Sequence, residues 1–588
     1  MTIWKKLWSM LDADERLSAG VLLGLMLIGM LLETLGVGLV IPALALMTQA
    51  DLPAKYPALA PWLAALGNPS NERLVVGGML TLTAVYAVKT VFLGFLALWQ
   101  ARFVYNLQAR LSTRLFSSYL HQPYTFHLQR NSAQLIRNTT NLVGEVTGVV
   151  EQGLMLVTEL LVLFGIALLL LLVEPLGALV VVSTLGLAGW TFHRVTRARV
   201  LRWGGARQRH EGLRIQHIQQ GLGGAKEMKV LGRETQFVIE YEQHNTGSAR
   251  IGQLQSTLKA LPRLWLELLA VTGLAGLVVV MIAQGKPLEA LLPILGLFAA
   301  AAFRFMPSVN RVLLAVQTMR FFLPGIDNFY AELSLLDPAR GLHRRQSLAF
   351  GDALSLEHVT FQYPAAESHA LVDVSLSIRC GDSVGFIGGS GAGKSTLVDI
   401  ILGLLTPTAG TVKVDGVDIQ GRLRDWQDQV GYVPQSIYLT DDSLRRNIAF
   451  GLPPEEIDEE SVLRAVRASQ LDKFIGQLPL GLDTIVGERG IRLSGGQRQR
   501  IGIARALYHD PAVLVLDEAT SSLDSETERG VMEAVRALHG EKTILIVAHR
   551  LSTVEHCDRL YRFEGGRLVQ EGDSTAMLGI ADVTAAAA

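Results

Sequence analysis

Six long apolar runs in the first half of the chain constrain its fold more than any other feature. Each is close to the roughly 20 residues that a helix needs to cross about 30 Å of hydrocarbon. One such run could be a buried helix of a soluble protein, but six of them predict a domain of six membrane-spanning helices. The runs lie near residues 20–47, 74–99, 150–172, 176–192, 264–284 and 288–318.

The composition agrees with a membrane domain and excludes two other classes of protein. Only 18% of the residues are charged, against about 25% in soluble proteins, and the mean hydropathy is +0.31. Such an apolar chain is not intrinsically disordered, because disordered chains are polar and highly charged. The two cysteines, Cys380 and Cys557, exclude a disulfide framework and a cysteine-based zinc site.

Basic residues indicate how the membrane domain is oriented. Segments 100–150 and 191–260 contain five and twelve lysines and arginines, while the loops on the opposite side contain very few. Since positively charged loops stay in the cytoplasm, both segments and both ends of the domain are predicted to lie there. The spanning helices are expected to continue into the cytoplasm, with inward turns near residues 121–131 and 208–224. On the outer side, residues 57–66 are either a helix on the membrane surface or a loop packed on the spans.

The second half of the chain has a different character. Residues 1–340 carry a net charge of +9 and the remainder carries −10, which indicates two domains of different kinds. Strands and helices alternate after residue 345, the pattern of an α/β domain with a largely parallel sheet. We predict a transmembrane domain over 1–325, a linker over 326–345, an α/β domain over 346–580 and a tail over 581–588. Strands are predicted at 354–363, 382–388, 430–433, 513–517 and 543–548, and a helix at 395–405.

One motif indicates the chemistry of the α/β domain. Gly388-Gly-Ser-Gly-Ala-Gly-Lys-Ser395 fits the phosphate-binding loop G-x-x-x-x-G-K-[ST] and lies between a predicted strand and a predicted helix. Glycines let backbone N–H groups surround phosphates, and the helix N-terminus adds a positive potential. Lys394 is expected to reach the outer phosphates and Ser395 to ligate Mg²⁺. The predicted ATP contacts here are Gly388, Ser390, Gly391, Gly393, Lys394, Ser395 and Thr396.

A pair of acids follows another predicted strand. Residues 513–517 are apolar up to Asp517, and Glu518 comes next. Acids at a strand end are often no more than surface residues, but beside a phosphate loop they favour ATP hydrolysis. We predict Asp517 as a Mg²⁺ ligand and Glu518 as the general base for the attacking water. The second half is therefore predicted to be a P-loop ATPase.

Between these motifs lies Leu493-Ser-Gly-Gly-Gln497, and with it the chain closely resembles the ATP-binding cassette (ABC) family over essentially its whole length. In that family two cassettes close on two nucleotides. The resemblance implies that Ser494, Gly495, Gly496, Gln497 and Asp524 contact the ATP held by a partner. It also implies that residues 487–490 form the exporter loop that meets the membrane domain. Ser522 stands where the family more often has Ala, a mild departure in the loop that carries Asp524.

Further family elements occur in the expected order. The resemblance implies that Tyr363 stacks on adenine, that Gln435 touches Mg²⁺ and that His549 is the switch residue at the γ-phosphate. The implied catalytic set is Glu518, His549, Lys394 and Gln435, and the Mg²⁺ ligands are Ser395, Gln435 and Asp517. The cofactors are then ATP and Mg²⁺, and no nucleic acid is involved.

The order of the two domains, membrane domain first, resembles that of exporters. Because one chain carries every half-site, a homodimer has two competent ATP sites, although a heterodimer stays possible. Such a translocase is expected in the inner membrane of a cell as a multi-pass protein with its cassette in the cytoplasm.

Basic residues in or beside the spans give a first indication of the cargo. Such charges are costly in a membrane, so they indicate a pathway for an anionic head group, snorkelling to the membrane surface, or pairing with Glu33, Glu159 or Glu267. Residues 303–311 and 262–263 resemble flippases of polyprenyl-pyrophosphate-linked oligosaccharides. The sequence thus predicts an exporter of a lipid-linked, anionic oligosaccharide; the alternatives are an exporter of another lipid such as lipid A, a drug or a peptide, and an ATP-gated channel or sensor. The candidate pathway residues are Lys89, Arg263, Arg304 and Arg311.

Overall fold

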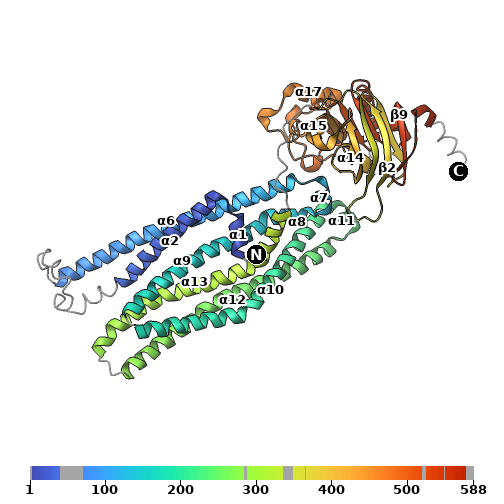
Figure 1. Cartoon of the computed structure of the whole chain (residues 1–588). Helices are drawn as coiled ribbons and strands as arrows, with labels where there is room; N and C mark the ends of the chain where they lie inside the picture. The colour runs from blue at the N-terminus through green and yellow to red at the C-terminus, as the bar shows by residue number, and fades with distance from the viewer. Residues whose placement is uncertain are drawn as a thin grey trace. The chain divides into compact units, whose positions relative to one another are not determined.

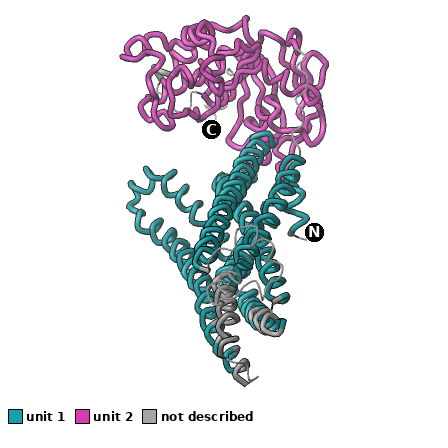
Figure 2. Tube along the Cα trace, turned by 90° about the vertical axis from the view of Figure 1, so that its left-hand side faces the viewer, with its two compact units in different colours: residues 1–122, 129–340 teal, residues 123–128, 341–588 magenta. Residues whose placement is uncertain are grey.

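The structure is a computed structural model that divides into two compact units. Residues 1–122 and 129–340 form the first unit, and residues 123–128 and 341–588 form the second (Figure 2). The residues described are 3–39, 71–173, 175–283, 288–335, 348–364, 366–519, 525–548 and 550–577, apart from the side chains at 71 and 525–527 and some between 173 and 304.

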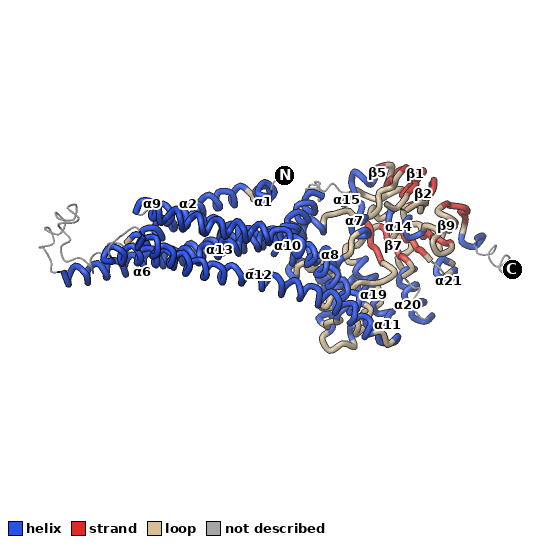
Figure 3. The backbone as a smooth tube through the Cα atoms, turned by 90° about the horizontal axis from the view of Figure 1, so that it is seen from below, coloured by secondary structure: helices blue, strands red, loops and turns tan. Residues whose placement is uncertain are grey.

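The first unit is made of long helices (Figures 1 and 3). Helix α6 has 50 residues, which at 1.5 Å per residue is about 75 Å, far longer than a 30 Å hydrocarbon core. This confirms the prediction that helices continue beyond the apolar runs. The principal helices are α1 (Ile3–Met10), α2 (Ala13–Gly38), α6 (Asn71–Leu120), α9 (Val143–Val173), α10 (Pro175–Gly223), α12 (Glu234–Ala283) and α13 (Leu288–Leu335).

Three helices within the described residues are long and apolar enough to cross a membrane. They cover Ala13–Gly38, Glu72–Leu120 and Ser132–Leu172. They contain the second and third predicted spans and residues 20–38 of the first, whose end at 40–47 lies outside the described residues. The fourth, fifth and sixth apolar runs fall in α10, α12 and α13, where several side chains lie outside the described residues. The number of six spans therefore stays a prediction.

A turn is confirmed where the first inward turn was predicted, while its place on the cytoplasmic side stays a prediction. Helix α6 ends at Leu120, and the chain then forms the short helices α7 (Tyr124–Gln129) and α8 (Ser132–Arg137) and a π-helical turn, η2 (Asn138–Leu142), before α9. Asn131 begins α8, because its side chain accepts a hydrogen bond from the Ala133 N–H at 2.8 Å.

The second predicted inward turn, at residues 208–224, is wrong. Helix α10 is unbroken to Gly223, and the turn follows as α11 (Ala225–Leu231) between Gly224 and Gly232. Gly232 has φ +61°, the left-handed conformation that ends helices. Gly223 and Gly224 at this end are poor helix formers, although α10 runs through the earlier pair Gly204 and Gly205 without a break.

The predicted linker is described only in part, and the predicted outer segment is not described at all. Helix α13 continues to Leu335 and so runs through 326–335, the start of the predicted linker. Residues 336–347 and the outer segment 57–66 lie outside the described residues. The domain boundaries stay predictions.

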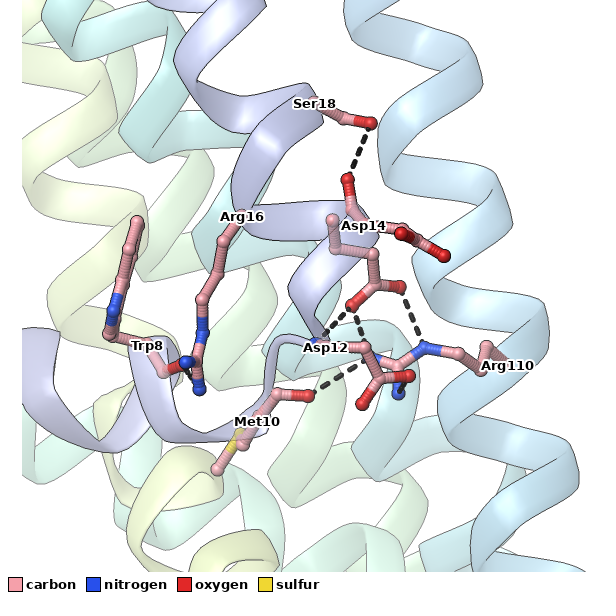
Figure 4. Close-up of polar contacts among 8 residues, drawn as sticks. Trp8, Met10, Asp12, Asp14, Arg16, Ser18 and Arg110 are labelled. Atoms are coloured by element: carbon pink, nitrogen blue, oxygen red, sulfur yellow. Dashed lines mark hydrogen bonds and ion pairs between the residues drawn. The ribbon is translucent and has the colours of Figure 1, made fainter.

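Arg110 of α6 holds the corner between α1 and α2 (Figure 4). Its guanidinium donates hydrogen bonds to Glu15 Oε1 at 2.6 Å, to Asp12 Oδ2 at 2.5 Å and to the Met10 carbonyl at 2.9 Å. The Asp12 N–H in turn donates to Glu15 Oε2 at 3.1 Å, which helps to begin α2. The arginine thus satisfies acceptors from both sides of the corner.

The second unit has the predicted α/β fold, built on two sheets. The larger sheet has the order β10-β9-β3-β8-β7-β6 and is parallel except for β10 at its edge, and the smaller antiparallel sheet has the order β2-β1-β4-β5. All predicted strands are confirmed, with ends that differ by at most two residues. The strands are β1 (Ala353–Phe361), β2 (Leu371–Arg379), β3 (Ser383–Gly388), β4 (Ala409–Val414), β5 (Val417–Asp418), β6 (Val430–Val433), β7 (Val513–Asp517), β8 (Thr543–Val547), β9 (Arg559–Glu564) and β10 (Arg567–Gly572).

Helices cover the larger sheet. Two apolar clusters pack against it, one including Leu397 of α14 and one including Ile501 of α19. The predicted helix 395–405 is shorter than expected, because α14 ends at Ile401. The helices are α14 (Lys394–Ile401), α15 (Leu423–Gln427), α16 (Leu444–Ile448), α17 (Glu459–Ala468), α18 (Asp472–Gly476), α19 (Gly495–Leu507), α20 (Ser525–Arg536) and α21 (Leu551–Val554).

Candidate nucleotide-binding site

The larger sheet brings the phosphate loop and the acid pair to one edge. Strand β8 lies between β3 and β7, and its Val547 pairs with Phe386 on one side and with Asp517 on the other. The loop that begins at Gly388 and the acids that begin at Asp517 therefore both leave the carboxyl ends of parallel strands. This edge is where open α/β sheets bind their ligands.

The glycines at both ends of the phosphate loop are required by its shape. Gly388 has φ +151°, and a Cβ there would lie 2.3 Å from the Phe563 carbonyl oxygen. Gly393 has φ +99°, and a Cβ there would lie 2.7 Å from the Ala370 carbonyl oxygen. Neither position accepts a side chain. The close approach is what lets the loop turn directly into α14.

Lys394 lies at the first turn of α14 with its amine folded back over the loop. Its Nζ donates hydrogen bonds to the carbonyl oxygens of Gly388 at 2.8 Å and Gly389 at 3.0 Å. Burial lowers the pKa of Lys394 from its usual value, while the carboxylates of Glu518 and Asp517 act in the opposite direction. The amine is thus held where phosphate oxygens would replace the carbonyl oxygens as its partners.

Gln435 and Glu518, which are far apart in sequence, meet at this edge. The Gln435 Nε2 donates to Glu518 Oε2 at 2.7 Å. Glu518 itself has φ +49°, a left-handed backbone that costs a residue with a side chain about 1 kcal/mol or more. Strained residues of this kind concentrate at functional sites, so the geometry supports a catalytic role for Glu518.

Tyr363 follows β1 and lies against the start of α14. Its hydroxyl is 3.1 Å from Thr396 Oγ1, and its ring is edge-on to Phe361 at 5.0 Å. Tyr363 is thus placed beside the phosphate loop and is half-buried, as an adenine-stacking residue needs to be.

The Ser494 loop is folded on itself and forms the start of α19. Ser494 Oγ accepts from the Gln497 N–H at 3.2 Å, and Gln497 Oε1 accepts from the Ser494 N–H at 2.8 Å. No hydrogen bond described for this unit joins Ser494 to residues 388–396 of the same chain. Ser494 is exposed, so this helix N-terminus is open to phosphates from elsewhere.

Two groups beside the acid pair were not predicted from the sequence. The Tyr432 hydroxyl donates to Asp517 Oδ2 at 3.4 Å. Burial, and then the charge of Asp517, raises the pKa of Asp399 to about 6. The signal for Asp399 was available, because it lies one helical turn after Ser395 and so on the same face of α14. Tyr432 could not be found this way, because β6 and β7 are adjacent only in the folded sheet.

The predicted Mg²⁺ ligands have suitable chemistry. Ser395, Gln435 and Asp517 supply hydroxyl, amide and carboxylate oxygens, the ligand type that Mg²⁺ prefers. When bound, the ion would neutralise phosphate charge. Two other predicted site residues, Asp524 and His549, lie outside the described residues.

The basic residues predicted for a cargo pathway are paired wherever their side chains are described. Lys89 lies 3.2 Å from Glu33, Arg311 contacts Glu159 at 2.5 and 3.2 Å, and Arg263 contacts Glu267 at 2.8 Å. These are the three acids that the sequence offered as alternative partners. The Arg304 side chain lies outside the described residues.

Comparisons with known proteins agree with this geometry. Residues 371–521 match the family described as ABC transporter, and residues 58–310 match the ABC transporter transmembrane region. An ATP-dependent lipid A-core flippase of Nitrosococcus oceani is 30% identical over 82% of this chain and 80% of its own length. A protein of the same name from Thiobacillus denitrificans is 32% identical over 81% of this chain and 82% of its own.

Among solved structures, that of a bacterial Atm1-family ABC exporter with ATP bound has a similar fold. The TM-score is 0.78, and the match covers 97% of both chains at 22% identity.

Proposed function

Since this chain belongs to the ABC transporter family as an exporter half-transporter, an ATPase coupled to transport, we propose that it flips a phosphorylated glycolipid across the inner membrane of a cell. The chain joins a multi-pass membrane domain to one ATP-binding cassette. A half-transporter of this kind implies a dimer. One observation carries the choice of cargo: the chain is about 30% identical, over four fifths of its length, to proteins named ATP-dependent lipid A-core flippase.

The proposed ATPase cycle depends on two copies of the chain. The phosphate loop and Lys394 of one copy hold a nucleotide, and the exposed Ser494 and the amides of Gly495 and Gly496 of the other copy close over it. Glu518, oriented by Gln435, takes a proton from the attacking water. His549 and Asp524 keep their predicted roles. ATP binding then closes the cassettes, and hydrolysis opens them again.

Two cargo classes share the chemistry of a phosphate, a glycan and apolar chains. A polyprenyl-pyrophosphate-linked oligosaccharide is favoured by the residues around Arg311 and Arg263. A lipid A-type glycolipid is favoured by the names of the relatives. Lys89, Arg263 and Arg311 remain candidate pathway residues, but each already faces a carboxylate, so a phosphate must displace that carboxylate to bind.

Reconstitution tests this proposal. The purified protein is placed in liposomes with ATP inside or outside, and the movement of fluorescent lipid A-core, polyprenyl-pyrophosphate oligosaccharide, a neutral glycolipid and a peptide is measured. We expect ATP-dependent flipping of at least one phosphorylated glycolipid and stimulation of the ATPase by it. Transport of only the neutral lipid or the peptide would make the chain a different exporter, and ion flux without transport would make it a channel.

A further inference from the structure

A cavity of about 500 Å³ lies between α9, α10 and α13 in the first unit. Its volume falls within the roughly 300–1,000 Å³ of small-molecule sites. The wall is almost entirely apolar, with His193 at one end. Residues that shape it include Phe164 of α9, Gly186 and Trp190 of α10, and Phe305 and Val309 of α13.

A polar recess adjoins this cavity and shares His193, Leu313 and Val316 with it. The recess adds Arg197, Gln317 and Arg320 to the lining. With a volume of about 10 Å³ it has room for about one water molecule, so a larger anion would sit at its mouth. The whole site thus has an apolar chamber and a basic end.

The polar groups at the basic end lack partners of their own. The Gln317 side chain is only 7% exposed, yet neither its Nε2 nor its Oε1 has a hydrogen-bond partner among the described residues. The same holds for the buried Arg320 Nη1, while Arg320 Nη2 contacts His193 Nε2 at 2.6 Å. Buried polar groups are almost always satisfied, so these atoms need a water molecule or a polar group of a ligand as their partner.

The charges at this end are also uncompensated. Within the described part of the chain, neither Arg197 nor Arg320 has a carboxylate within ion-pair distance, whereas Lys89 and Arg311 each have one. The contact of Arg320 with His193 does not compensate the charge, because a histidine side chain carries no negative charge. Two arginines that share no acid are a favourable site for a phosphate.

The depth of the two ends matches an inner-leaflet lipid. At 1.5 Å per residue, Gly186 lies about 17 Å along α10 from Pro175, and His193 and Arg197 lie about 27 and 33 Å along it. With Pro175 near the outer boundary of a 30 Å core, the basic end lies at the cytoplasmic boundary and the chamber reaches toward the middle. A lipid of the inner leaflet has its phosphate and its chains in this same order.

We propose that α9, α10 and α13 form the binding site for a phosphorylated lipid of the inner leaflet, with its phosphate on Arg197, Arg320 and Gln317 and an acyl or prenyl chain in the chamber. That this lipid is the cargo rests on the proposed function. The cavity volume accommodates one chain, so the rest of a glycolipid would lie outside the chamber. The site therefore selects the phosphate and the chain.

The binding test uses the full-length dimer in nanodiscs of phosphatidylcholine without ATP. Diphosphorylated lipid A with brominated chains is titrated in, and the quenching due to Trp190 is obtained by subtracting the signal of Trp190→Phe. Dephosphorylated lipid A and inorganic phosphate are the comparison ligands. We expect the phosphorylated lipid to bind about tenfold or more tightly than the dephosphorylated one, and inorganic phosphate not to compete.

Matched variants separate the two ends of the site. Arg197→Gln with Arg320→Gln should weaken the phosphorylated lipid about tenfold or more and leave the dephosphorylated lipid unchanged. Gly186→Leu fills the chamber, since a Cβ at Gly186 meets no atom within 4 Å, and should weaken both lipids. The controls are Arg199→Gln, an exposed arginine of α10 outside the cavity lining, and Gly94→Leu, an open glycine of α6.

Several results would overturn the site. One is equal affinity of wild type and the double arginine variant for the phosphorylated lipid. If the double variant does not fold, the single variant Arg197→Gln is tested instead, because Arg197 is exposed and its replacement should not disturb folding. Another is competition by inorganic phosphate at the affinity of the lipid. Failure of the proposed function looks different: the wild type binds as expected but flips no phosphorylated glycolipid. If the double arginine variant flips the lipid at the wild-type rate, the proposed binding site is wrong while the proposed function still holds.

Discussion

The ion pair between Glu159 of α9 and Arg311 of α13 allows a sharp test of what holds the membrane helices together. Arg311 donates from Nε to Glu159 Oε1 at 2.5 Å and from Nη2 to Oε2 at 3.2 Å. The Glu159 side chain is 9% exposed and the Arg311 side chain 31%. Arg311→Met removes the charge and keeps an apolar chain of similar reach, which leaves the carboxylate buried without a partner.

The size of the effect follows from this burial. Breaking a buried ion pair by removing one partner costs about 3–5 kcal/mol. Because the guanidinium is partly exposed, we expect the lower end, about 3 kcal/mol, which is about a hundredfold change in the folded-to-unfolded ratio. Replacing both partners removes the unpaired charge, so the double variant Glu159→Met/Arg311→Met should return to within about 1 kcal/mol of wild type.

The assay is unfolding of the purified protein by sodium dodecyl sulfate in mixed micelles, with wild type, both single variants and the double variant forming a double-mutant cycle. If the losses of the two single variants simply add in the double variant, the pair contributes no coupling and the reasoning is wrong. Measuring cargo flipping by the same proteins distinguishes two roles of Arg311, pairing with Glu159 and contacting the cargo. A stable double variant that still flips cargo means that Arg311 acts through Glu159, whereas a stable one that does not flip makes Arg311 a cargo contact.

Three further predictions concern the cassette and the helix corner. Glu518→Gln should bind a fluorescent ATP analogue normally and release phosphate about 10²–10⁴-fold more slowly, and near-normal release would exclude Glu518 as the base. Gly393→Ala should abolish that binding because of its contacts below 3 Å, whereas Gly391→Ala, which also has a positive φ but open space around it, should reduce binding much less. Arg110→Ala removes the donor shared by acceptors on both sides of the α1–α2 corner and should lower the free energy of unfolding by about 1–3 kcal/mol, with the exposed Arg102→Ala as the unaffected control in the same assay.

The nucleotide site was largely predictable because its requirements are local. A loop that wraps phosphates needs glycines at set positions, and the φ values of Gly388 and Gly393 confirm that need. Strand ends were predictable from short apolar runs. The second inward turn was not, because α10 runs through the glycine pair Gly204 and Gly205 and ends only at Gly223, so local composition does not tell which glycines end the helix.

The sequence by itself determined the kind of protein this is. Three features identify it: apolar runs of spanning length, a phosphate loop and a Ser-Gly-Gly motif. Each can be recognised from one short stretch of the chain. Only the tertiary structure decided which charges are paired. Glu159 and Arg311 are 152 residues apart, and His193 and Arg320 are 127 apart, so helix packing, not local pattern, joins them.

Among the described residues, the same packing leaves Arg197 and Arg320 without an acid beside an apolar cavity, and nothing in the sequence distinguishes these two arginines from the others. Every basic residue near a span looks alike in the sequence, because the cost of its charge depends on the groups that the neighbouring helices bring to it.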